Sequence, residues 1–178
     1  MNSGHSMLAS RAIVSRRGEE ATLGRMDSFI VAREEREIIR SPVGGDLTFL
    51  VRTEQSNGTL LAVEVIAPAG EGPPLHTHTR EEETIYVVSG EFRFQVGDEV
   101  RDAPVGAFAF VPRGIAHTWQ NVGDEPGMLL ATFAPAGMEG FFERLSRMQE
   151  FDPVEFRAAS AEQGTDVVGP PLAVSHPL

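Results

Sequence analysis

Short apolar runs separated by Gly, Pro, Asn and Asp follow one another through residues 26–135, and this pattern constrains the fold more than any other feature. Such runs are typical of the strands and turns of an all-β sandwich or barrel. The clearest alternation lies at 91–96, where Phe92, Phe94 and Val96 face one way and the polar residues face the other. We therefore predict an all-β domain over 26–135.

The predicted strands are bounded by turn residues. They cover residues 46–52, 59–66, 85–88, 92–96, 107–111, 117–122 and 128–133. Asn57 and Gly58 stand between the first two strands, and this pair supplies the positive φ angles that a tight hairpin turn requires. We predict a hairpin at this position.

Residues 136–178 have a different pattern and form a predicted helical annex that packs on the barrel. Apolar residues recur there at helical spacing, at Met138, Phe141, Phe142, Leu145 and Met148. Asp152 followed by Pro153 indicates the start of a second short helix, which ends near Gly164 and is followed by a Pro- and Gly-rich tail over 169–178. The first helix either covers the barrel or forms a dimer contact.

Residues 1–25 mix Ser, Gly and Arg without a sustained period, so we predict a flexible N-terminal arm. No apolar run approaches the ~18 residues that a membrane span needs. We expect a soluble, cytoplasmic protein.

Composition excludes several classes of function. The formal net charge of −11 disfavours binding to nucleic acids and to anionic membranes. The absence of cysteine excludes disulfides, thiolate nucleophiles and Cys-ligated metals. All 15 basic residues are arginines, which excludes a catalytic lysine. A metal site in this chain therefore needs nitrogen and oxygen ligands.

Two histidines in the strand region are candidate metal ligands. His76 and His78 project from one face if residues 75–79 are extended, although such a pair alone is weak evidence. Three consecutive glutamates follow, and strand alternation backwards from Ile85 places Glu83 on the inner face in preference to Glu82. A run of charges is otherwise typical of a solvated surface.

The spacing of these residues extends over 70–121. Gly70 is followed after five residues by His76-x-His78, after four by Glu83 and after six by Gly90; a second frame contains Gly106, Pro112-x-Gly114, His117 and Asn121. This resembles the paired motifs of the cupin superfamily. The resemblance implies an antiparallel jelly-roll barrel, here a single-domain, quercetinase-like cupin, in which His76, His78, Glu83 and His117 bind one divalent metal ion.

Three imidazoles and one carboxylate suit a first-row divalent ion such as Fe, Mn, Ni, Cu or Zn, with positions left open for water, dioxygen or substrate. Trp119 has the same strand parity as His117 and lines the substrate pocket or packs in the core. Phe108 and Phe110 line the same pocket or pack outward. Asn121 and the frame glycines are interpreted as structural.

We predict a dioxygenase that acts on an aromatic or enol-type small molecule, with Glu83 as the residue that accepts a substrate proton. Two alternatives remain open at this stage. One is a metal-dependent isomerase or lyase acting on a small polar substrate, and the other is a non-enzymatic binding module. The resemblance also implies a homodimer.

Overall fold

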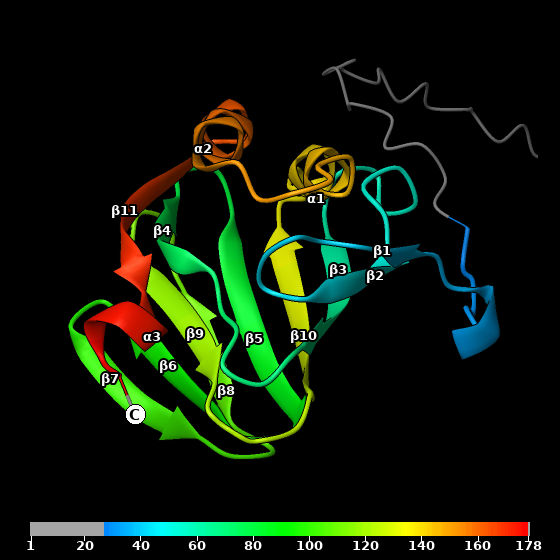
Figure 1. Ribbon diagram of the computed structural model, residues 1–178. Helices are drawn as coiled ribbons and strands as arrows, with labels where there is room; N and C mark the ends of the chain where they lie inside the picture. The colour runs from blue at the N-terminus through cyan, green and yellow to red at the C-terminus, as the bar shows by residue number, and fades with distance from the viewer. Residues whose placement is uncertain (1–26, 178) are drawn as a thin grey trace, which may run out of the picture.

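The computed structural model describes residues 27–177, in which two antiparallel sheets enclose a barrel (Figure 1). The six-stranded sheet has the order β1 (Ile38–Ile39), β2 (Asp46–Val51), β3 (Leu61–Ala67), β10 (Gly127–Ala134), β5 (Glu82–Ser89) and β8 (Phe108–Val111). The five-stranded sheet has the order β11 (Thr165–Pro171), β4 (Pro74–His78), β9 (His117–Asn121), β6 (Phe92–Val96) and β7 (Glu99–Ala103). The predicted all-β jelly-roll fold is confirmed.

Short helices complete the described chain. They are the 3-10 helix η1 (Arg33–Glu35) and the α-helices α1 (Glu139–Leu145), α2 (Pro153–Glu162) and α3 (Leu172–Ser175). Helices α1 and α2 lie together at one end of the barrel (Figure 1). The predicted C-terminal helical annex is therefore present, and it closes one end of the barrel.

The hairpin between β2 and β3 follows the predicted turn chemistry. Asn57 and Gly58 have φ angles of 49° and 77°, so both occupy the left-handed region that this pair tolerates. The connection is wider than a two-residue turn, because β2 ends at Val51 and β3 begins at Leu61. The buried hydroxyl of Ser56 accepts from the Leu60 amide and donates to the Leu60 carbonyl, which closes this wider loop.

Strand alternation builds the core from both sheets. On β10, Leu129, Ala131 and Phe133 are buried and the residues between them are partly exposed. One apolar cluster in the barrel surrounds Phe92 and Trp119, and a second extends from β2, β3 and β10 to the inner faces of α1 and α2. Because the second cluster crosses from the barrel to the annex, the annex packs as part of the same core.

Helix α2 begins as the sequence indicates. The Asp152 carboxylate accepts hydrogen bonds from the backbone amides of Val154 and Glu155, with Pro153 in the first turn. The Glu155 carboxylate does not bond back to the backbone amide of Asp152. It accepts a hydrogen bond from the guanidinium of Arg144 on α1 at 2.6 Å instead. This ion pair instead joins the two helices.

The prediction of a Pro- and Gly-rich tail over 169–178 is corrected by the structure. Residues Thr165–Pro171 form β11, which pairs antiparallel with β4 and extends the five-stranded sheet, and α3 follows it. Apolar alternation is absent here because Gly and Pro interrupt the strand, and β11 is an edge strand, where such residues are tolerated. Strand β7, which is charged and mostly exposed, was missed because its side chains lack an apolar face.

The predicted N-terminal arm, 1–25, lies outside the described residues. Within 27–177, none of the helices has the length and apolar character needed to cross a bilayer.

Two adjacent leucines on β10 test which residues of this strand face the barrel interior. Leu129→Ala removes a side chain that is 1% exposed and should lower the free energy of unfolding by about 2–5 kcal/mol, as core Leu→Ala changes do. Leu130→Ala, on the partly exposed face, should cost clearly less. Urea denaturation followed by circular dichroism measures both, and equal losses would contradict the assigned faces.

Candidate metal centre

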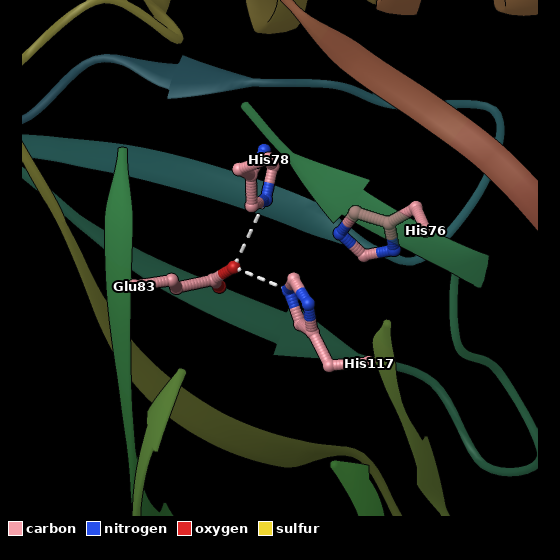
Figure 2. Close-up of side chains that lie close together, drawn as sticks. All are labelled: His76, His78, Glu83 and His117. Carbon is pink, nitrogen blue, oxygen red and sulfur yellow. Dashed lines mark hydrogen bonds and ion pairs between the residues drawn. The ribbon is translucent and has the colours of Figure 1, made fainter. Parts of the chain in front are cut away.

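Four side chains from three strands converge inside the barrel. His76 and His78 come from β4 and His117 from β9, all in the five-stranded sheet, whereas Glu83 reaches across from β5 in the six-stranded sheet. Their ligand atoms all lie within 4.8 Å of one another. Figure 2 shows the four side chains pointing toward a common centre. The residues singled out by spacing are brought together by the fold.

Glu83 forms direct contacts with two of the histidines. One of its carboxylate oxygens, Oε2, lies 2.8 Å from His117 Nε2 and 3.1 Å from His78 Nε2 (Figure 2). The ring of His76 lies 4.3 Å from the His117 ring and 4.9 Å from the His78 ring, measured between centroids. His78, Glu83 and His117 are almost fully buried.

The outer nitrogens of the histidines fix how two of the rings face the centre. His76 Nδ1 lies 2.8 Å from the Pro74 carbonyl, and His117 Nδ1 lies 3.0 Å from the Ile115 carbonyl. A carbonyl only accepts hydrogen bonds, so each Nδ1 carries a hydrogen and each Nε2 faces the centre. This is the orientation in which an imidazole offers Nε2 to a metal.

Burial and close contacts shift the ionisation of the centre. Burial alone would raise the pKa of Glu83, but hydrogen bonds from His117 and His78 outweigh it and hold that pKa below the ordinary value. For His117, burial lowers the pKa, yet the Glu83 carboxylate raises it overall. Burial, reinforced by the charges of His117 and His78, lowers the pKa of His76 to about 3. The centre thus holds a carboxylate anion among imidazoles.

The three consecutive glutamates have three separate environments. Glu83 faces the barrel interior as predicted, whereas Glu82 faces outward and pairs with Arg113 at 2.8 Å. Glu81 is 2% exposed, and its Oε2 has no hydrogen-bond partner among the described residues. Burial raises the pKa of Glu81. The expectation that the rest of the charge run is a solvated surface therefore holds for Glu82 and fails for Glu81.

An apolar cavity adjoins the centre and extends to the annex. Its walls come from the barrel and from the C-terminal helices and β11, and they include Val63, Val65, Ile85, Trp119, Leu129, Phe133, Met138, Phe141, Phe142, Leu145, Phe156 and Val167. His76, His78 and Glu83 line it as well. Trp119 both lines this cavity and packs edge-to-face on Phe92, so its two proposed roles coexist.

The placement of Phe108 and Phe110 in the pocket is corrected. Both side chains point outward from β8 and are 62% and 56% exposed. Register explains the error. Glu83 and Ile85 on β5 face inward opposite Val111 and Ala109, so Phe108 and Phe110, which alternate with these two residues, face the solvent. Phe108 and Phe110 share one face of β8 whichever way the strand is turned. The sequence alone therefore could not show whether that face points inward or outward.

Asn121 has the structural role that the sequence favoured, whereas the sequence indicated no role for Thr165. Asn121 is structural, because its amide donates to the carbonyls of Ala67 and Glu125 and its oxygen accepts from the Gly123 amide. Thr165 was missed. Its hydroxyl lies 2.9 Å from His78 Nδ1, a contact made across 87 residues of chain that no local motif marks.

Comparison with known proteins agrees with this geometry. Residues 62–133 match the family model of the cupin domain. The barrel is similar to a cupin domain over these residues. The chain is similar to an RmlC-like cupin from Shewanella frigidimarina, whose crystal structure superposes with a TM-score of 0.53 at 29% identity over 62% of this chain and 93% of that one. The annex lies outside the matched residues.

Two curated proteins are similar to parts of this chain. Protein SchB of Streptomyces halstedii is 29% identical over 94 residues, which cover 52% of this chain and 67% of SchB. Germin-like protein subfamily 2 member 2 of Arabidopsis thaliana is 27% identical over 124 residues, which cover 65% of this chain and 56% of the relative. The chain thus spans between about half and two thirds of these relatives.

The donor set of the cupin domain fits a divalent ion. Three imidazoles and one carboxylate suit Fe, Mn, Ni, Cu or Zn, and geometry alone does not choose among them. A buried carboxylate anion surrounded by imidazole nitrogens is also the charge arrangement that a cation completes. His76, His78, Glu83 and His117 would hold the ion.

Adjacent glutamates again supply a matched control. Glu83→Gln and His78→Ala should each weaken binding of a divalent metal, because each removes a ligand. The loss should exceed the about 10- to 100-fold loss that is typical when an outer partner of a ligand is removed. Glu82→Gln, with an outward side chain, should bind as the wild type does. Elemental analysis and chelator competition on protein without a histidine tag measure this. Unchanged metal content in Glu83→Gln would contradict the ligand assignment.

Proposed function

We propose that this protein is a metal-dependent dioxygenase that acts on an aromatic or enol-type small molecule. The observation that carries the proposal is the cavity beside the metal centre. Among the described residues that line it, Glu83 is the one acidic side chain and there is no arginine. The remaining walls are mostly aliphatic and aromatic, which favours a flat apolar substrate.

The residues of the site have distinct roles in this proposal. A bound divalent ion would supply the means to bring substrate and dioxygen together and to polarise the substrate oxygen. Glu83 accepts the proton of an enol or phenol hydroxyl, since its carboxylate faces the centre. Trp119 and the annex phenylalanines orient the ring and exclude water. Both oxygen atoms of dioxygen enter the products as a C–C bond is cleaved.

The alternative isomerase or lyase on a small polar substrate has less support. Such a substrate needs charged groups around the metal, and none of the three arginines nearest in sequence, Arg80, Arg93 and Arg113, lines the cavity. Arg93 pairs with Asp102 on the outer face, and Arg113 pairs with Glu82. Neither lines the cavity.

Oxygen uptake tests the proposal directly. With metal-loaded protein, we expect uptake on addition of a flavonol, a β-diketone or a catechol. Trp119→Leu should raise KM about 2- to 10-fold, because it removes aromatic contact with the substrate. Val168→Leu, on the exposed side of β11, should leave KM unchanged.

The contrary result is equally specific. No uptake with any of the three classes at full metal occupancy would contradict the dioxygenase. Tight ligand binding without turnover would then favour the non-enzymatic module, and conversion of a small polar acid or sugar without oxygen would favour the isomerase or lyase.

We also propose that the protein forms a homodimer through the outer face of β5 and β8. Tyr86, Val88, Phe108 and Phe110 are between 40% and 62% exposed and lie on neighbouring strands of this face. Strand β8 is the last strand of its sheet among the described residues, so its outer edge is open to pairing. A patch of this kind is typical of an interface.

Light scattering after size exclusion checks the dimer. The wild type should elute with twice the chain mass, and Phe108→Ser with Phe110→Ser should shift it toward the monomer. Val174→Ser, an exposed apolar position on α3, is the control and should stay dimeric. A monomeric wild type, or a double variant that remains dimeric, would rule out this interface.

A further inference from the structure

The C-terminal annex reaches the metal centre through one side chain. Thr165 is the first residue of β11 and lies opposite His78 in the pairing with β4, so the two side chains share the inner face of the sheet. Thr165 is 4% exposed, and its hydroxyl oxygen lies 2.9 Å from His78 Nδ1. It lies beyond residues 62–133, which match the cupin domain.

His78 differs from the other two histidines in its outer partner. His76 and His117 each donate Nδ1–H to a backbone carbonyl two residues earlier, in a contact internal to their own segment. His78 has a side-chain hydroxyl from a distant segment in that place. The orientation of this ring therefore depends on where β11 lies.

We propose that Thr165 is a positioning residue of the metal centre, whose hydroxyl accepts the Nδ1–H of His78 and so holds His78 Nε2 toward the ion. This rests on the proposed metal function. It makes the annex part of the site, because the cupin domain by itself supplies no such partner for His78 among the described residues.

The second contact of the hydroxyl supports this direction of hydrogen bonding. Thr165 Oγ1 donates to the thioether sulfur of Met138 at 3.5 Å, and a hydroxyl has a single hydrogen. With that hydrogen directed at Met138, the oxygen is left to accept from His78. Met138 directly precedes α1 and is 1% exposed, so the start of α1 and the start of β11 meet at this hydroxyl.

The backbone beside Thr165 fixes its position. Gly164, at φ +78°, ends the turn after α2, and its carbonyl accepts from both the amide and the hydroxyl of Thr79, each at 2.8 Å. A Cβ on Gly164 would lie 2.7 Å from Thr79 Oγ1, so this close approach requires glycine. Since Thr79 directly follows His78, the two segments are locked in register at the ligand.

Three variants separate positioning from folding. Thr165→Val keeps the size and removes the hydroxyl, Thr165→Ser keeps the hydroxyl, and Thr132→Val removes a hydroxyl that pairs with Thr84 away from the centre. Zn(II) affinity is measured by chelator competition on the full chain. In parallel, ¹⁵N NMR of the zinc-bound protein reports whether His78 carries its hydrogen on Nδ1.

We expect Thr165→Val to bind Zn(II) about 10- to 100-fold more weakly, the usual effect of losing an outer partner of a ligating histidine. Thr165→Ser and Thr132→Val should bind as the wild type, and the wild-type NMR signals should place the hydrogen on Nδ1.

Zinc affinity unchanged in Thr165→Val, an equal loss in Thr165→Ser, or a hydrogen on Nε2 would overturn the positioning role and leave the metal site standing. A wild type that binds none of the divalent metals would overturn the metal function and the positioning role together.

Discussion

Glu83 crosses the interior of the barrel and meets histidines from the opposite sheet, and the rest of the centre depends on this contact. A carboxylate that is 5% exposed pays a desolvation cost that only hydrogen bonds or opposite charge can offset. His117 Nε2 and His78 Nε2 lie 2.8 and 3.1 Å from its Oε2. The two sheets must therefore keep a fixed separation and register at this point.

The barrel provides that register through strand pairing. Glu83 pairs with Phe133 on one side and Val111 on the other, deep in the six-stranded sheet, while His76 pairs with His117 across β4 and β9. Neighbours on two sides hold the β5 backbone at the ligand. The candidate metal ligands thus lie on strands rather than on free loops, which favours a preorganised centre.

The annex closes one end of the barrel and also places side chains beside the candidate metal centre. Its phenylalanines and Leu145 form part of the cavity wall, and its strand β11 brings a hydroxyl to His78. Arg144 joins α1 to α2 through ion pairs with Glu155 and Glu162. The barrel supplies the candidate ligands, and the residues that follow it form part of the wall of the adjoining cavity.

The sequence by itself determined the strand-rich barrel, the hairpin at Asn57 and the start of α2 at Asp152. These follow from local periodicity and turn chemistry, which act between near neighbours. The four candidate ligands came from the resemblance of the spacing over 70–121 to the cupin motifs. It left the parity of β8, the strand β11 and the role of Thr165 open. Those were decided by pairing between segments far apart in the chain, because the face that a short strand buries depends on its neighbours and not on its own residues.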